Sequence, residues 1–132
     1  MTTEDLTSVQ KKISAKRFDE ALHDLEPILE TSPESSDALY MRAVCLRYRG
    51  ECQIALDVLS RLKNLDPEHG RAYQEEGHNY RDLDRADDAL LAYSLACRFN
   101  PALEASWRGQ LKILTSKGLD AQAEQAKAQL ER

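Results

Sequence analysis

The strongest constraint on the fold is a repeat with a period of 34 residues. Pro33, Pro67 and Pro101 recur at this spacing. Alanine keeps the same interval, at Ala21, Ala55, Ala89 and Ala123. Two residue types in one period indicate a duplicated structural unit. We therefore divide the single domain expected over residues 1–132 into repeats 2–35, 36–69, 70–103 and a truncated 104–132.

Each repeat is predicted to be a hairpin of two helices. Tyr73, Gly77 and Tyr80 follow an i, i+4, i+7 spacing in the third repeat. The same spacing returns in that repeat at Ala89, Tyr93 and Ala96. Such spacing places the side chains on one face of a helix, so two amphipathic helices follow one another.

Turn signals separate the helices. Gly50 and Gly118 stand between the two helices of their repeats, where a residue that tolerates positive φ can turn the chain, and Asp84 takes that place in the third repeat. A proline inside a helix removes a hydrogen bond, so we expect a kink or an early end at Pro27. The predicted helices are 3–14, 17–31, 36–48, 52–64, 70–82, 86–98, 104–116 and 119–131.

This pattern resembles the tetratricopeptide repeat (TPR) family. The third repeat carries it best, through Tyr73, Gly77, Tyr80, Ala89, Tyr93, Ala96 and Pro101. The first repeat diverges, because Asp5 and Lys12 fall where apolar residues are expected. The resemblance implies an all-α fold, a right-handed TPR solenoid of about four antiparallel helix hairpins with eight helices.

The resemblance also implies that the first helices of the repeats line a concave groove. The residues that it places there are Tyr40, Val44, Arg47, Tyr48, Arg71, Gln74, His78, Arg81, Arg108 and Lys112. Several arginines facing one cleft favour a carboxylate or an acidic peptide. Asp37, Glu75 and Asp82 come from the same surface, and local pairing with the arginines is the alternative.

Chaperone-binding TPR domains hold two carboxylates with Lys and Asn side chains. The corresponding places hold Leu6, Gln10, Met41, Arg71 and Glu75, of which only Arg71 is chemically similar. The sequence therefore disfavours binding of a chaperone's C-terminal tail and leaves a different extended peptide open.

Composition narrows the function further. The net charge of −5 disfavours nucleic acid and anionic lipid surfaces as partners. We find no apolar run long enough for a membrane span, no export signal, and no motif for catalysis, a metal or a cofactor. Cys45, Cys52 and Cys97 are expected to be reduced thiols in a cytoplasmic protein.

Three interpretations remain at this level. The favoured one is a non-catalytic scaffold that binds a peptide or protein partner in the groove. The second is a TPR segment of a larger enzyme that docks a substrate or mediates oligomerisation, because residues 70–108 resemble TPR segments that precede sulfotransferase domains in some bacterial proteins. The third is homo-oligomerisation through an uncapped end of the solenoid.

Overall fold

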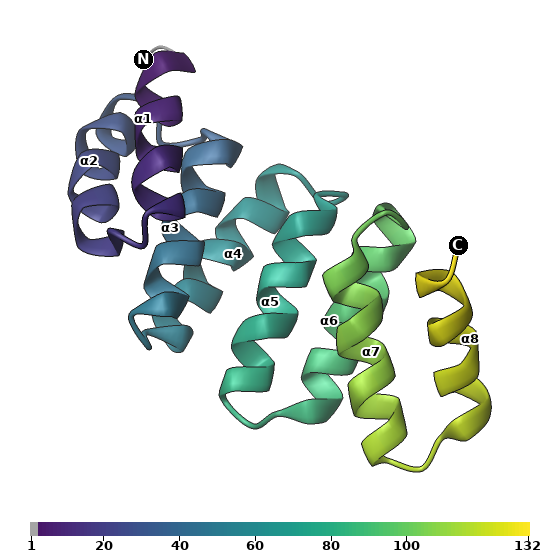
Figure 1. Ribbon diagram of the computed structural model, residues 1–132. Coiled ribbons are helices and arrows are strands. Elements are labelled where there is room, and N and C mark those ends of the chain that lie inside the picture. The colour runs from purple at the N-terminus through teal and green to yellow at the C-terminus, as the bar shows by residue number, and fades with distance from the viewer. Residues whose placement is uncertain (1–2) are drawn as a thin grey trace. The chain divides into compact units, whose positions relative to one another are not determined.

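The chain is all-α wherever the structure describes it. The structure is a computed structural model that describes the backbone of residues 3–132 and the side chains from Leu6 onward. Eight helices and no strand occur over these residues (Figure 1). The helices are α1 (Thr3–Ser14), α2 (Phe18–Thr31), α3 (Ser36–Tyr48), α4 (Cys52–Leu65), α5 (Gly70–Asp82), α6 (Ala86–Phe99), α7 (Glu104–Ser116) and α8 (Asp120–Leu130). The predicted fold class is confirmed, and each predicted helix end lies within one residue of the observed one.

The turns inside the hairpins use left-handed backbone, as the sequence predicts. Gly50 and Gly118 have φ of 80° and 74°, and Asp84 has φ of 59°. The first hairpin makes the same turn with Lys16, at φ of 63°, which the sequence analysis did not identify. Lysine has no side-chain oxygen to favour this conformation, so no residue-type signal marks that turn.

Helices α3 and α5 each begin at a side-chain cap. The Ser35 hydroxyl oxygen accepts a hydrogen bond from the Ala38 backbone N–H at 3.3 Å. The His69 Nδ1 accepts one from the Ala72 N–H at 3.1 Å. Both caps satisfy an amide that has no partner within its helix, and they fix where the two helices start.

Pro27 lies inside α2 without ending it. The helix continues to Thr31, so the early end that the sequence left open does not occur. Because proline has no N–H, the His23 carbonyl lacks the donor that the i+4 residue normally supplies. One turn later, the Thr31 hydroxyl donates a hydrogen bond to the Pro27 carbonyl at 3.1 Å.

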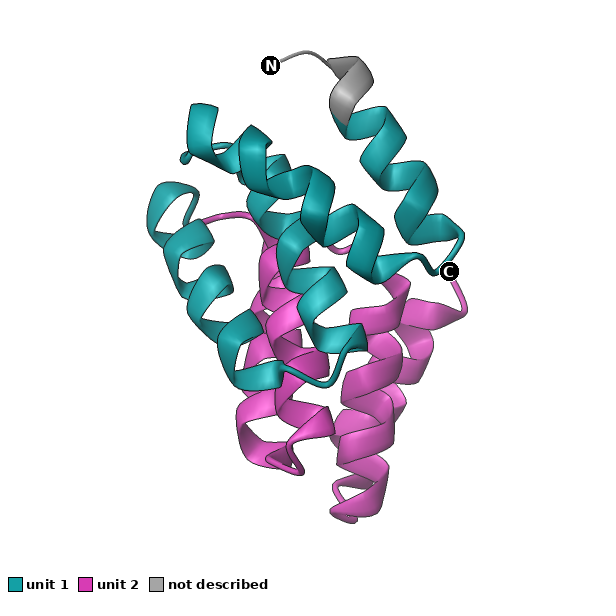
Figure 2. Cartoon of the chain, turned by 90° about the vertical axis from the view of Figure 1, so that its left-hand side faces the viewer, with its two compact units in different colours: residues 1–67 teal, residues 68–132 magenta. Residues whose placement is uncertain are grey.

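Two compact units divide the chain, residues 1–67 and residues 68–132, hereafter unit 1 and unit 2 (Figure 2). Within unit 1, α1 packs on α2 and α3, α2 packs on α3, and α3 packs on α4. Helices α5 to α8 of unit 2 repeat this pattern of contacts in the same order. Each unit is therefore a pair of stacked hairpins, and the single domain over the whole chain stays a prediction.

Each unit has its own apolar core. In unit 1 the divergent first repeat takes part, because Val9 on α1 is buried against Ala21, Leu25 and Ile28 on α2. In unit 2, Tyr93 on α6 is buried with Ala89 and with Ile113 on α7. Leu114, Ala123 and Ala126 join α7 to α8. None of the helices described has the length and apolar character needed to cross a membrane.

Candidate functional site

A basic cavity of about 470 Å³ lies between α5 and α7 in unit 2. Four of its lining residues were predicted from the sequence to line a groove, namely His78, Arg81, Arg108 and Lys112. The other lining residues are Tyr93, Ala105, Gly109, Ile113 and Ser116. His78 on α5 and Lys112 on α7 thus line the same cavity.

The inner wall of the cavity is the ring of Tyr93, which is fully buried. Gly77 on α5 and Gly109 on α7 flank the two long edges of this ring. A Cβ atom on Gly77 would lie 2.6 Å from Tyr93 Cδ1, and one on Gly109 would lie 2.5 Å from Cε2. Only glycine fits at these distances, so the two helices hold the ring in one place.

His78 connects the inner wall to the basic rim. Its Nδ1 lies 2.6 Å from the Tyr93 hydroxyl and 3.4 Å from Arg81 Nη1. A guanidinium group can only donate, so in the tautomer whose Nδ1 is unprotonated both Arg81 and the Tyr93 hydroxyl donate to this nitrogen.

The cations of the rim make only weak local pairs. Arg81 binds the carboxylate of its neighbour Asp82 at 3.0 Å, and Arg108 binds Glu104 at 3.1 Å. Pairing of Arg81 with Asp82 is one of the local pairs that the sequence left open. Exposed pairs of this kind contribute about 0–1 kcal/mol, so a ligand carboxylate can replace them at small cost. Lys112 has no ion pair with any residue that the structure describes.

Two other predicted residues of unit 2 lie outside the cavity lining. Gln74 accepts a hydrogen bond from the Ser106 hydroxyl at 2.8 Å and so links α5 to α7. Arg71 is exposed near the start of α5. Through its hydrogen bond with Ser106, Gln74 connects the two helices that line the cavity.

The remaining predicted residues lie on α3 in unit 1. Tyr48 stacks on Phe18 with ring centroids 4.6 Å apart and planes 2° from parallel. The Arg47 guanidinium lies 4.3 Å from the Tyr48 ring centroid. Tyr40 and Val44 are half-buried. A groove shared by these residues with those of unit 2 stays a prediction.

Sequence reasoning missed the contributions of Gly109, Ile113 and Ser116 to the cavity. A signal for Gly109 exists, because an isolated glycine inside a helix lowers helix stability and usually has a packing reason. The sequence places Tyr93 on one helix face with Ala89 and Ala96, and all three are fully buried. The Tyr93 hydroxyl nevertheless contacts the site, because it is hydrogen-bonded to the lining residue His78.

The donors around the cavity suit an anion. They are two guanidinium groups, one ammonium group and the imidazole ring of His78. In the part of the chain that the structure describes, no group of three or more His, Cys, Asp or Glu residues is placed to hold a metal ion.

Behind the cavity, Cys97 is a buried thiol held between α6 and α7. The Gln110 Nε2 donates to its sulfur at 3.1 Å, and the Ser94 hydroxyl donates to the Gln110 Oε1 at 3.2 Å. Burial raises the pKa of the Cys97 thiol from 9.0 to about 11, although the Gln110 hydrogen bond lowers it. The thiol is therefore uncharged at neutral pH and serves as a packing residue.

This pKa predicts a loss of stability in alkaline solution. Between pH 9 and about 11 the thiol ionises in the unfolded chain and stays protonated in the folded one. The free energy of unfolding therefore falls with rising pH, by about 2 kcal/mol at pH 11 from this group. Urea denaturation at several pH values measures the slope, and Cys97→Ala should flatten it. An equal slope in both proteins would contradict the assignment.

Comparison with known proteins identifies the repeats. Residues 12–75 match the model of the tetratricopeptide repeat. A tomato (Solanum lycopersicum) protein described as a probable UDP-N-acetylglucosamine–peptide N-acetylglucosaminyltransferase SPINDLY is 27% identical over 67% of this chain and 10% of its own length. Human (Homo sapiens) tetratricopeptide repeat protein 13 is 24% identical over 76% of this chain and 12% of its own length. The chain thus spans about a tenth of the length of these curated relatives.

Solved structures share the fold at low sequence identity. The Naa15/Naa10 complex bound to HypK-THB contains a chain that matches 96% of this one with a TM-score of 0.84, at 20% identity and over 19% of its own length. The first TPR of Spaghetti (RPAP3), bound to the HSP90 peptide SRMEEVD, matches 89% of this chain and 97% of its own, with a TM-score of 0.78 and 15% identity. These matches confirm the fold that the repeat pattern predicted.

Proposed function

Since this chain is built of tetratricopeptide repeats, we propose that it is a non-catalytic scaffold that binds an acidic segment of a protein partner. The cavity of unit 2 is the binding site in this proposal. The observation that carries it is the convergence of Arg81 from α5 with Arg108 and Lys112 from α7 on one cavity. Three cations around a recess attract carboxylates and concentrate an acidic partner near the surface.

The size of the cavity sets the size of the ligand. A volume of about 470 Å³ falls within the usual range of small-ligand sites, so it takes one or two side chains of an extended segment. A glutamate fits this description, because its carboxylate can meet the cations while its methylene groups contact Ala105 and Ile113. The RPAP3 structure supports the proposal in general terms, since a TPR domain of similar fold holds a peptide with acidic residues.

Charge reversal tests this site. We expect the triple variant Arg81→Glu, Arg108→Glu, Lys112→Glu to bind a fluorescent Ala-Glu-Glu-Leu-Glu peptide at least about tenfold more weakly, since three attractive contacts become repulsive. Fluorescence anisotropy measures the affinity, and circular dichroism checks that helix content is unchanged.

A matched control reverses three exposed cations outside the cavity, Lys11→Glu, Lys127→Glu and Arg132→Glu, with the same change of net charge. Equal weakening in both triple variants would attribute binding to overall charge and overturn the proposed site. A peptide with glutamine in place of each glutamate should show no measurable binding to the unchanged protein or to the cavity variant.

A second function has specific support. The tomato relative is described as a glycosyltransferase, and this chain matches only a tenth of it. The chain would then serve as the repeat segment of a larger enzyme and would dock its substrate or mediate oligomerisation. Immunoblotting of the native source separates the two functions, because a band well above 15.0 kDa favours the larger enzyme and a band at that mass favours the scaffold.

The scaffold proposal includes a cytoplasmic location and no cofactor, nucleic acid or membrane partner. The net charge of −5 opposes attraction to phosphates and to anionic lipid. Self-association remains an alternative, and light scattering on dilute protein tests it by reporting the mass of the particle.

A further inference from the structure

Helices α2 and α4 of unit 1 both pack on α3, and a groove runs between them. Two recesses of about 220 Å³ and 270 Å³ lie along this groove, and each is lined by residues of the α2, α3 and α4 sides. Glu26, Leu29 and Arg42 line both recesses, so the two are continuous. We call this feature the α2–α4 groove.

The two recesses lie one helical turn apart. From the α2 side, the first is lined by Leu22, Leu25, Glu26 and Leu29, and the second by Glu26, Leu29, Glu30 and Pro33. Each residue of the first set thus has a counterpart four places later in the second set. Four residues of an α-helix rise about 6 Å, which is the separation of side chains at i and i+4 on one face of a helix.

The interior of both recesses is apolar. Leu25 and Leu46 are buried at the first recess, and Leu39 is buried at the second. Ile54 on α4 lines the first recess and is 47% exposed, although its side chain is large and apolar. Both volumes lie below the usual range of small-ligand sites, so each recess takes a single apolar side chain, whose burial removes this surface from water.

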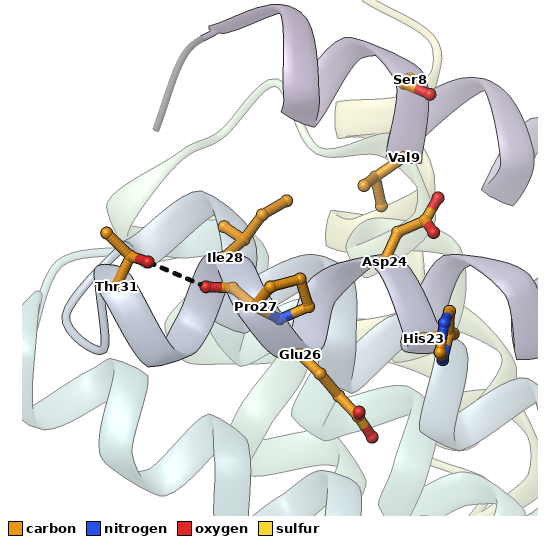
Figure 3. A pocket seen from close by; sticks show the side chains of 8 residues that line it. All are labelled: Ser8, Val9, His23, Asp24, Glu26, Pro27, Ile28 and Thr31. Carbon is orange, nitrogen blue, oxygen red and sulfur yellow. Dashed lines mark hydrogen bonds between the residues drawn. The ribbon is translucent and has the colours of Figure 1, made fainter.

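The two sides of the groove carry opposite charges. Glu26 and Glu30 belong to the α2 side, and the Glu26 side chain points away from Val9 on the other side of α2 (Figure 3). Arg42 on α3 and Arg61 on α4 line the groove from the other helices. All four charged side chains are exposed, and none has an ion pair with any residue in the described part of the chain. Their charges are therefore available to a bound partner.

The charges on both sides favour a helix over an extended strand as the occupant. In a strand, side chains at i and i+2 are about 6–7 Å apart and match the two recesses, but the residue between them points to the opposite face. A helix with apolar residues at i and i+4 instead presents its residues at i+1 and i+3 on the two flanks of that pair. Both charged sides of the groove can then be contacted at once.

From this combination we propose that the α2–α4 groove binds a helix of a partner protein that presents two leucine-sized residues one turn apart, with an acidic residue on one flank and a basic residue on the other. The two apolar side chains enter the two recesses. The basic flank meets Glu26 and Glu30, and the acidic flank meets Arg42 and Arg61. The proposal goes beyond the binding of acidic segments at unit 2, because it assigns a second surface, in unit 1, to a helical ligand.

Peptide titration of the full chain, followed by ¹⁵N–¹H NMR, tests the groove. The probe is the blocked peptide Ala-Glu-Ala-Ala-Lys-Leu-Glu-Ala-Lys-Leu-Ala-Ala-Gln-Ala, with its leucines at i and i+4. We expect it to shift the amide signals of Leu22, Leu29, Arg42 and Ile54.

Two control peptides test the spacing and the charges. Exchanging the second leucine with the alanine two places before it keeps the composition but places the leucines at i and i+2, and should weaken binding about fivefold because one recess stays empty. Replacing the Glu and Lys between the leucines with Gln should weaken binding about threefold, as for the loss of exposed charge contacts. Equal or tighter binding of either control would overturn the proposed helical ligand.

Two matched variants of the protein make the test specific. Ile54→Asn removes an exposed apolar side chain from the first recess and should weaken binding of the probe about fivefold. Leu91→Asn makes a similar change on the exposed surface of α6 in unit 2 and should leave the affinity unchanged. Equal effects of the two variants, or shifts confined to residues outside the groove, would overturn the proposal.

Dilution of the protein without peptide tests a second copy of this chain as the occupant. The amide signals of the groove should not change on dilution. A change confined to Leu22, Leu29, Arg42 and Ile54 would assign the groove to self-association and overturn the proposal. None of these outcomes bears on the basic cavity of unit 2, which the charge-reversal variant tests separately.

Discussion

Replacing Tyr93 with alanine is expected to lower the free energy of unfolding by about 3–5 kcal/mol, the usual cost of removing a large buried aromatic side chain. The ring is fully buried and stands between two glycines. Neither glycine has a side chain that can move into the vacated space, so the cavity cannot collapse cheaply. Urea denaturation of the full chain, followed by circular dichroism, measures the loss.

Tyr93→Phe is the matched control for this prediction. It keeps the ring and removes only the hydroxyl that is hydrogen-bonded to His78 Nδ1. The expected cost is about 1 kcal/mol, the net value of one hydrogen bond. If the alanine variant were no less stable than the phenylalanine variant, the ring would not be the structural link between α5, α6 and α7.

The double variant Gly77→Ala, Gly109→Ala should have the second largest effect, a loss of about 2–4 kcal/mol. Alanine gains about 1 kcal/mol per site in helix propensity over glycine. Here each new Cβ would overlap an edge of the Tyr93 ring, at 2.6 Å and 2.5 Å. Because the clashes fall on opposite edges, the ring cannot move away from one methyl without approaching the other.

A mutant cycle with Tyr93→Ala separates the clash with the ring from the gain in helix propensity in the Gly77→Ala, Gly109→Ala variant. Once the ring is gone, the same two alanines should be neutral or stabilising, since only the propensity gain remains. Stability can be measured by urea denaturation in all four proteins. Equal losses with and without the ring would mean that the glycines matter for another reason, and the tight packing described here would be wrong.

The helices were predictable because each repeat signals its own boundaries. Prolines follow the second helix of each of the first three repeats, and Gly50 or Asp84 turns the chain between the two helices of a repeat. These signals depend on backbone conformation alone, so they work without knowledge of the packing. Lys16 makes the same turn with no residue-type signal, which is why that turn was not predicted.

The site was predictable only in part. Repeat spacing brought His78, Arg81, Arg108 and Lys112 to one surface, and all four line the cavity of unit 2. Repeat spacing does not predict which hydrogen-bond partner a given side chain has. The hydrogen bond from Ser106 to Gln74 is an example, because side-chain rotamers decide such contacts within a few ångströms.

The packing order within each unit bears on how the chain folds. The interhelical contacts of the described residues join helices that are neighbours or next neighbours along the chain. Such local connectivity gives a low contact order, which in small domains goes with folding in microseconds to milliseconds. Within each unit, the second hairpin can therefore form beside the first as soon as both have left the ribosome, before later residues are synthesised.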